Sequence, residues 1–436
     1  ALSRWKDSRQ RKPLVLGGAR QVGKTYLIKE FGRREFASTI YLNFEEDPAL
    51  DSLFAGRLAP ERLLQSLSRY GRQPITPGAT LIVLDEIQQS NRALNSLKYF
   101  AEQAPEQHVV AAGSLLGVQL SKPGSFPVGK VNTLQLYPLT FAEFLDACGD
   151  QPLLDELEEA SIAPLPEVFH RALLERLRSY FFVGGMPEAV AVYVDTADVG
   201  AVSRVHKELL VGYQADFGKH APGEMVPKLN LLWSSIPAQL ARENKKFVYS
   251  ALHRGARARG YEDGLAWLAG AGLIHRCQRA SVPEVPLASS VDPNAFKVYL
   301  HDVGLLGALA GTTSTNLASD ELFSAFRGAF VENYVAQELA ARDLPLHYWR
   351  SKATAEVDFL LSLPGVVLPL EAKAGINPRS KSLRVYDELY QPPALLRTTA
   401  LNRRHDGKIC NIPLYALNGL ATAVGLCLEA RDDERH

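Results

Sequence analysis

The stretch Gly18-Ala-Arg-Gln-Val-Gly23-Lys24-Thr25 decides the fold of the first part of the chain. The apolar run Leu14-Val-Leu-Gly17 precedes it, and residues 26–31 follow with the character of a helix. A Walker A loop has this setting, because its backbone N–H groups and the helix N-terminus face bound phosphates. The predicted nucleotide-binding residues are Gly18, Ala19, Arg20, Gln21, Val22, Gly23, Lys24 and Thr25. We expect ATP here, with Lys24 on the β- and γ-phosphates and Thr25 as a magnesium ligand.

A second apolar run, Leu81-Ile-Val-Leu-Asp85-Glu86, ends in two acids. Adjacent carboxylates at the end of a buried strand are costly without a cation, so this run is interpreted as a Walker B strand. Asp85 is expected to hold Mg²⁺ and Glu86 to polarise the attacking water as the catalytic base. Ser114 follows the next apolar run and is either a sensor of the γ-phosphate or an ordinary loop serine.

These motifs lie in an alternation of strands and helices. Strands are expected at residues 14–17, 39–44, 80–84 and 108–112, and helices at 26–31, 53–70 and 94–103. Such alternation predicts a parallel sheet that is covered by helices on both faces.

The composition describes a globular chain of several domains. It has 436 residues, 46% of them hydrophobic, and 48 basic side chains balance 48 acidic ones. This balance excludes a histone-like polycation, although it allows a local basic patch. The four cysteines are far apart, and no pair has the spacing of a zinc knuckle or a redox motif. Because no run of about 18 apolar residues occurs, we expect no membrane partner and a cytoplasmic protein.

A series of stretches resembles one family, the prokaryotic AAA+-like ATPases that carry a C-terminal domain of unknown function. They include the Walker A loop, Leu84-Asp-Glu-Ile-Gln88, Ala112-Gly-Ser-Leu-Leu-Gly117, and residues 126–131, 136–145, 180–190, 216–219, 296–306, 330–333 and 371–373. The resemblance covers nearly the whole chain. It implies Mg²⁺-dependent ATP hydrolysis and a homo-oligomer, because such cores often take an arginine from a neighbouring subunit. Neither Arg20 nor Lys130 can be assigned that role.

The segment from Arg242 to Arg259 concentrates positive charge. It holds six basic residues and one acid, Glu243. Helices are expected at 247–254 and 261–269 and a strand at 273–277, the outline of a winged helix. The proposed nucleic-acid contacts are Lys245, Lys246, Arg254, Arg257 and Arg259. The alternative, a protein–protein or lid module with a solvated basic face, stays open.

The last part of the chain carries a set of carboxylates. Glu332 lies in an expected helix at 323–341, strands are expected at 346–350, 356–361 and 366–373, and a helix follows. Alternation places Glu356 and Asp358 on one face of their strand, and Glu371 and Lys373 on one face of the next. If the two strands pair as a hairpin across Pro364-Gly365, these side chains converge.

This layout resembles the PD-(D/E)XK restriction-endonuclease-like superfamily. The resemblance implies Mg²⁺ or Mn²⁺ at Asp358 and Glu371 with support from Glu332, and catalytic roles for Asp358, Glu371 and Lys373, with Lys373 orienting the water. The alternative is an ion pair between Glu371 and Lys373 beside a solvated Asp358.

The sequence therefore predicts an α/β multidomain protein. Residues 1–150 form a parallel-sheet P-loop NTPase core, 151–295 a helical linker and winged helix, and 296–436 a restriction-endonuclease-like domain. Three functions remain: an ATP-gated DNA nuclease, a nucleotide-switched regulator that binds DNA or protein without cutting, and a protein-remodelling module without nucleic acid.

Overall fold

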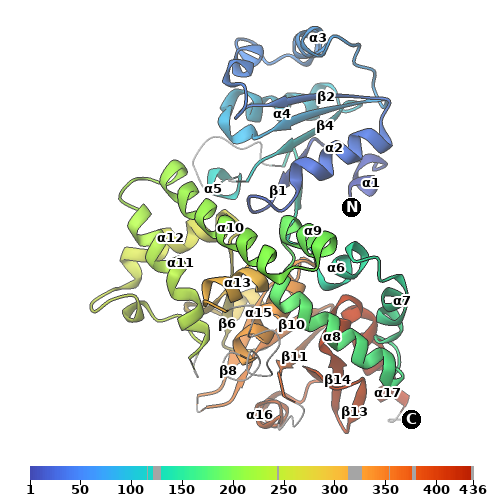
Figure 1. Ribbon diagram of the computed structural model, residues 1–436, viewed down its shortest axis with the longest axis vertical. Coiled ribbons are helices and arrows are strands. Elements are labelled where there is room, and N and C mark those ends of the chain that lie inside the picture. The colour runs from blue at the N-terminus through green and yellow to red at the C-terminus, as the bar shows by residue number, and fades with distance from the viewer. Residues whose placement is uncertain are drawn as a thin grey trace. The chain divides into compact units, whose positions relative to one another are not determined.

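The computed structural model describes residues 1–114, 116–120, 129–242, 245–312, 327–352, 354–375 and 380–433. The chain divides into two compact units (Figure 1). The first contains Ala1–Tyr137 and Ala266–Leu273, and the second contains Pro138–Leu265 and Ile274–His436. The division into three domains stays a prediction.

The first unit is built on a parallel sheet. Its described strands are β1 (Leu14–Gly17), β2 (Ser38–Asn43), β3 (Thr80–Asp85), β4 (His108–Ala112) and β5 (Asn132–Gln135). They lie in the order β2-β3-β4-β1-β5, and every pairing is parallel. The helices are α1 (Leu2–Lys6), α2 (Lys24–Glu35), η1 (Pro48–Phe54), α3 (Pro60–Gly71), η2 (Ile87–Gln89), α4 (Asn91–Gln103) and α5 (Leu116–Leu120). The predicted parallel sheet is confirmed.

Helices cover both faces of this sheet, as Figure 1 shows. Strand β3 is buried throughout, and its side chains alternate between two cores. Ile82 and Leu84 pack with residues of α3 and α4, whereas Leu81 and Val83 pack with residues of α1 and α2. A strand that is buried on both faces must be apolar at every position, which explains the uninterrupted run before Asp85.

One predicted helix is split. The helix expected at 53–70 is instead the end of η1 followed by α3, which starts at Pro60. Gly56 has a positive φ of 75° between them, and proline is favoured in the first turn of a helix because it lacks an N–H to donate.

The second unit begins with a layer of helices. They are α6 (Phe141–Ala147), α7 (Gln151–Glu159), α8 (Glu167–Val183), α9 (Pro187–Thr196), α10 (Val199–His220), α11 (Val226–Leu240), η3 (Tyr249–Ala251) and the first part of α12 (Ala258–Gly270), whose residues from Ala266 onward belong to the first unit. Later in the chain come η4 (Leu287–Ser290), α13 (Val303–Leu309), α15 (Arg327–Ala340), α16 (Lys381–Tyr390), η6 (Leu414–Gly419) and α17 (Leu420–Asp433). Within the described ranges, no helix has both the length and the apolar character that crossing a membrane requires.

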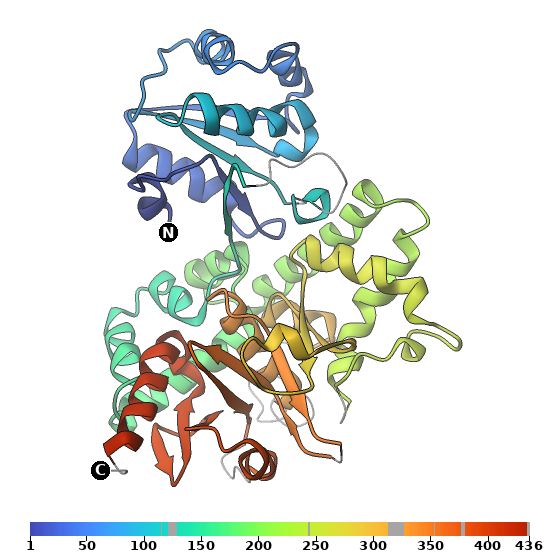
Figure 2. The ribbon, with the colours of Figure 1, turned by 180° about the vertical axis from the view of Figure 1, so that it is seen from behind.

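Two mixed sheets complete this unit. One has the order β7-β6-β8-β9, with β6 (Ile274–Ala280), β7 (Val291–Leu300), β8 (His347–Arg350) and β9 (Glu356–Val357). The other has the order β10-β11-β12-β14-β13, with β10 (Phe359–Leu363), β11 (Val366–Ala372), β12 (Leu395–Thr399), β13 (Arg404–Asp406) and β14 (Ile409–Pro413). Figure 2 shows α17, in red, beside the last strands.

The helix predicted at 247–254 is wrong. Only the short η3 forms there, because the preceding backbone is held extended by long-range bonds. The side chain of Gln239 bonds both the N–H and the C=O of Val248, and the N–H of Phe247 donates to the carbonyl of Phe296 at 2.8 Å. The helix and strand that follow, α12 and β6, confirm the prediction for 261–277.

The predicted hairpin in the last part of the chain is confirmed. β10 and β11 pair antiparallel across Pro364-Gly365, with Phe359 opposite Leu370. The strand expected at 356–361 is divided, however, because β9 pairs in one sheet and β10 in the other. Strands β12 to β14 were not predicted. Of the helix expected at 323–341, residues 323–326 lie outside the described ranges.

Candidate active site

The loop between β1 and α2 has the backbone of an anion-binding turn. Gly18 and Gly23 have φ values of 145° and 90°, and Gln21 has a φ of 64°. A Cβ on Gly18 would stand 2.5 Å from the carbonyl oxygen of Leu136, so only glycine fits. Helix α2 begins at Lys24, directly after this curl, and its first N–H groups therefore face the loop.

Lys24 is folded into its own loop. Its Nζ donates to the carbonyls of Gly18 at 2.9 Å and Ala19 at 2.7 Å, and the residue is 6% exposed. Burial lowers the pKa of Lys24 to about 8, although the carboxylates of Glu86 and Asp85 oppose the shift. The ammonium lies where the loop can present it to a phosphate.

Asp85 joins the loop to the end of β3. Its Oδ2 accepts hydrogen bonds from Thr25 Oγ1 at 2.8 Å and from the hydroxyl of Tyr41 at 2.6 Å, and its Oδ1 accepts from the N–H of Glu86 at 3.0 Å. All three donors are neutral, so no side-chain cation in these contacts compensates the charge of the buried carboxylate. A hydroxyl and a carboxylate in contact are hard oxygen ligands that fit Mg²⁺.

Glu86 occupies a constrained position beyond the strand. Its φ is 51°, which is unusual for a non-glycine residue, and the amide of Gln88 donates to its Oε2. Burial raises the pKa of Glu86, and the neighbouring charge of Asp85 adds to the shift. A carboxylate with a raised pKa is a better proton acceptor near neutral pH.

The other predicted residues of this unit lie around these groups. Ser114 follows β4, which is paired between β1 and β3, so the serine lies at the sheet edge that carries both motifs. Arg20 lies 3.9 Å from Glu45, with a side chain 39% exposed. Lys130 pairs with Glu102 at 2.9 Å. Neither contact assigns a role toward a neighbouring subunit.

A segment far along the chain also belongs to the first unit. In residues Ala266–Leu273, Gly272 lies so close to the phosphate loop that a Cβ would stand 3.1 Å from the N of Ala19. Gly117 and Gly270 approach through their backbones, since a Cβ on Gly117 would stand 2.2 Å from the carbonyl oxygen of Gly270. The sequence analysis expected here only the end of a helix at 261–269 and the start of a strand at 273.

In the second unit, a lysine that the sequence interpretation missed lies among the predicted carboxylates. Lys297 on β7 is fully buried, and its Nζ lies 2.7 Å from Glu356, 3.5 Å from Glu332 and 3.6 Å from Asp358. Burial alone would lower the pKa of Lys297, but Tyr299 and the three acids raise it well above the ordinary value. The lysine is therefore a permanent cation at the centre of this carboxylate cluster.

Further cations compensate the cluster. Lys245 forms an ion pair with Glu332, and its side chain is 14% exposed. Although burial raises the pKa of Glu332, Lys297 and Lys245 outweigh it and lower the pKa. Lys373 lies 3.0 Å from Glu371, as the ion-pair alternative predicted. Asp358 is not solvated, however: it is buried and accepts the N–H of Ala372 at 3.0 Å.

The metal site that the resemblance implied, with Asp358 and Glu371 as ligands, stays a prediction. In the described part of the chain, the oxygens of Glu332, Asp358 and Glu371 do not form a group that lies within 4.8 Å throughout. Glu371 Oε2 is buried and has no hydrogen-bond partner among the described residues. This oxygen could accept a donor or bind a cation, and Lys373 lies at the other oxygen of the same carboxylate.

The basic side chains between Arg242 and Arg259 do not all lie on one surface. Lys245 faces the carboxylate cluster, whereas Arg254, Arg257 and Arg259 are exposed. Lys246 is half-buried, and Glu243 lies outside the described ranges.

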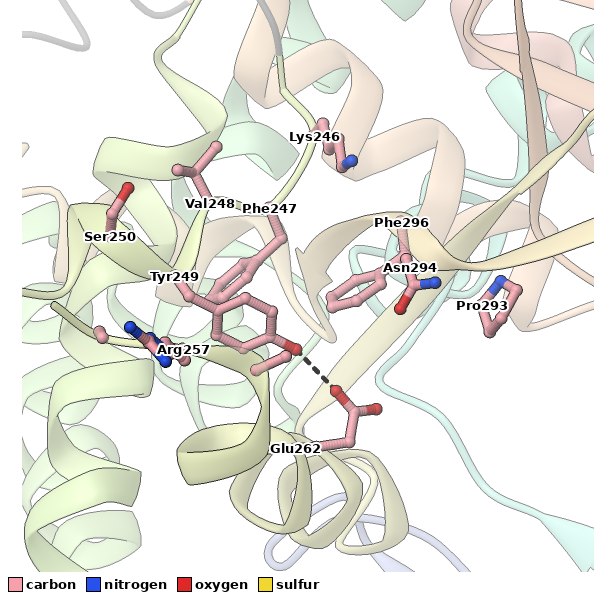
Figure 3. Close-up of a pocket in the computed structure, with 12 residues that line it drawn as sticks. Lys246, Phe247, Val248, Tyr249, Ser250, Arg257, Glu262, Pro293, Asn294 and Phe296 are labelled. Atoms are coloured by element: carbon pink, nitrogen blue, oxygen red, sulfur yellow. Dashed lines mark hydrogen bonds between the residues drawn. The ribbon is translucent and has the colours of Figure 1, made fainter.

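Two of these residues line an aromatic pocket of about 500 Å³, shown in Figure 3. The rings of Phe247 and Phe296 stack there with centroids 5.7 Å apart, and Lys246 and Arg257 stand at its rim. The hydroxyl of Tyr249 donates to Glu262 at 2.6 Å. Both rings are buried, at 4% and 2% exposed, so the cations at the rim are the groups of this pocket that a ligand could reach.

Three family models match successive parts of the chain. Residues 10–145 match an AAA domain, residues 174–316 match a domain of unknown function (DUF8612), and residues 327–417 match another (DUF4143). No match was found among the curated proteins.

Similar solved structures include the Walker-type ATPase of Pyrococcus abyssi, with 16% identity, a TM-score of 0.46, and coverage of 71% of this chain and 94% of that chain. The Orc1 protein of Aeropyrum pernix in complex with DNA gives 16% identity, a TM-score of 0.31, and coverage of 71% and 89%. Cdc6p of Pyrobaculum aerophilum has 12% identity and a TM-score of 0.25, and the match covers 73% of this chain and 91% of that chain. With the Walker geometry and the AAA match together, residues 10–145 form a P-loop ATPase domain of the AAA type.

Proposed function

We propose that the first unit binds MgATP on residues 18–25 and hydrolyses it with Glu86 as the base. The observation that carries this proposal is the contact of 2.8 Å between Thr25 Oγ1 and Asp85 Oδ2, which joins the phosphate loop to the acidic strand end. These two oxygens come from segments 60 residues apart and meet at the place where a P-loop enzyme needs its metal ligands.

Each residue then has a separate task. Lys24 exchanges the carbonyls of Gly18 and Ala19 for the β- and γ-phosphate oxygens. Thr25 would bind Mg²⁺ and Asp85 would hold it through a water molecule, and the ion would neutralise charge on the phosphates. The N–H groups of the loop and of α2 supply the remaining donors.

Glu86 orients the attacking water and accepts its proton. Its raised pKa favours proton transfer, and the bond from Gln88 fixes its carboxylate. Ser114, at the same sheet edge, is the proposed contact to the γ-phosphate or to the water.

The proposal is tested by ATP hydrolysis and by calorimetric binding on Glu86→Gln. We expect binding to persist and turnover to fall by about 10²–10⁴-fold. Glu61→Gln, which changes an exposed acid on α3, is the matched control and should leave both unchanged. If Glu86→Gln hydrolyses ATP at the wild-type rate, the assignment of the base is wrong.

For the second unit, we propose the alternative in which nucleotide binding switches a domain that does not cut. Lys297 supports it, because its buried ammonium lies beside Glu332 and Asp358, two of the three acids that the nuclease site would use. The exposed side chains of Arg254, Arg257 and Arg259 support nucleic-acid phosphates as the partner.

Two measurements separate the alternatives. Supercoiled and linear DNA are incubated with the protein, Mn²⁺ and ATP, and we expect no cutting; cutting that Asp358→Ala abolishes would restore the nuclease. Binding of labelled single-stranded DNA is then titrated with salt, and we expect a steep salt dependence that becomes shallower in Arg254→Ala/Arg257→Ala. A protein-only partner would show neither effect.

A further inference from the structure

Three potential metal ligands that are separated in the sequence meet at the end of the last sheet. His405 lies on β13, Cys410 on β14 and Cys427 on α17. One ligand atom from each, a ring nitrogen and two Sγ atoms, lies within 4.8 Å of both others. Neither Cys410 nor Cys427 is in a disulfide.

The backbone fixes this convergence. His405 and Cys410 are direct partners in the antiparallel pairing of β13 and β14, so their side chains share one face of the hairpin. Their Nδ1 and Sγ atoms are 3.4 Å apart. Zn–S and Zn–N bonds at a tetrahedral angle place such atoms about 3.6 Å apart, so the observed spacing needs little adjustment. Helix α17 brings the third ligand onto the same face.

The surroundings favour a soft ion. Cys410 and Cys427 are buried, whereas His405 is exposed, so the group has a closed side and an open side. The nearby carboxylate of Asp406 is engaged by Arg397 and Arg404. Arg403 Nη2 lies 3.9 Å from Cys427 Sγ and can donate to a thiolate as an outer hydrogen bond.

We propose that His405, Cys410 and Cys427 bind one Zn²⁺ ion, with a water molecule in the fourth position on the exposed side. Two thiolates and an imidazole are the ligands that zinc prefers, and three protein ligands leave one position open. The ion ties the edge hairpin of β13 and β14 to α17, and it is independent of the nucleotide site.

The test uses the full chain, stripped of metal with a chelator and titrated with Co²⁺. We expect one Co²⁺ per chain to produce a thiolate-to-metal charge-transfer band, which Zn²⁺ then removes by displacement. Because this band requires a sulfur ligand, Co²⁺ bound at the carboxylates of either unit cannot imitate it.

Three variants give the controls. Cys427→Ser should abolish the band, and His405→Ala, an exposed site that should fold normally, should weaken Zn²⁺ binding by more than about tenfold. Cys148→Ser, a thiol outside the group, should leave the band unchanged. The proposal is overturned if wild-type protein gives no band, if His405→Ala binds Zn²⁺ as wild type does, or if mass spectrometry finds Cys410 and Cys427 joined as a disulfide in freshly isolated protein.

Discussion

Two sets of acids lie at strand ends in this molecule, and the chain compensates them in different ways. Asp85 in the first unit is contacted by neutral donors, the hydroxyls of Thr25 and Tyr41 and a backbone N–H. Asp358 in the second unit has buried Lys297 at 3.6 Å. Both carboxylates are buried; Lys24 acts on Asp85 only through space, whereas Lys297 lies within ion-pair distance of Asp358.

The difference shows where an external cation is needed. Neutral donors do not cancel a buried charge, so the first site gains from a divalent ion. The second has Lys297 among its acids, although burial and the charge of Glu332 still raise the pKa of Asp358 to about 7. A motif of acidic residues in a sequence therefore predicts where negative charge is concentrated. Whether that charge binds a metal ion depends on the donors and cations that contact the acids in the fold.

The largest expected effect is on catalysis in the first unit. Asp85→Asn keeps the shape of the side chain and removes its charge, so Mg²⁺-dependent ATP hydrolysis should fall by about 10³-fold, in line with the several kcal/mol that a catalytic metal supplies. The melting temperature without nucleotide should be unchanged or higher, because a buried charge is lost. A large drop in melting temperature would contradict the claim that the charge of Asp85 is uncompensated without a bound cation.

In the second unit, Lys297→Met removes the cation instead of an acid, and it tests stability instead of catalysis. It leaves Glu332, Glu356 and Asp358 without their central cation, so we expect the free energy of unfolding to fall by about 3–5 kcal/mol. Urea unfolding followed by circular dichroism measures the change. Lys381→Met, at an exposed position of α16, is the control and should have little effect; equal losses in both variants would contradict the role of Lys297.

Asp302 adds a third case to the comparison of Asp85 with Asp358. It is a buried acid whose oxygens accept hydrogen bonds from neutral backbone N–H groups. Its oxygens accept the N–H groups of Gly185 at 2.6 Å and Leu305 at 2.9 Å. Burial raises the pKa of Asp302 to about 6, while its hydrogen bonds oppose the shift. Because the folded state holds this proton more tightly, stability should fall as pH rises from about 4 to about 6.

The measurement is the difference in unfolding free energy between wild type and Asp302→Asn across that range. The variant does not titrate there, so wild type should lose about 3 kcal/mol relative to it, in proportion to a shift of about two pKa units. A constant difference would show that the carboxyl group ionises in the folded protein as it does in the unfolded chain.

The smallest expected effect concerns the outermost cation of the cluster. Arg350 lies 3.9 Å from Glu356, whereas Lys297 lies 2.7 Å from it. Arg350→Met should therefore change the free energy of unfolding by less than about 1 kcal/mol. A loss as large as that of Lys297→Met would show that compensation is spread over the cluster rather than centred on one lysine.

Local patterns predicted the first unit well. The Walker loop and the apolar run before Asp85 are contiguous signals, and a parallel sheet follows from them. The second unit depends on contacts between distant segments. The sequence around Lys297 is that of an ordinary strand. No pattern in the neighbouring residues predicts that Lys297 contacts Glu332, Glu356 and Asp358.

The failures have the same origin. The helix expected at 247–254 is prevented by the side chain of Gln239, which no short window includes. The spacing of the cysteines excluded a zinc motif, yet a hairpin and a helix bring two of them to one histidine. Spacing rules detect sites made by one turn of chain and miss sites made by topology.

The bare contact of Gly117 with Gly270 has a mechanical consequence. With no side chains between them, the two backbones have no rotamers that could absorb a displacement. A side chain at Gly117 would therefore have to push the two backbones apart, because its Cβ would stand 2.2 Å from the carbonyl oxygen of Gly270. Gly117→Ala is thus expected to disturb the packing of residues 266–273 against the rest of the first unit.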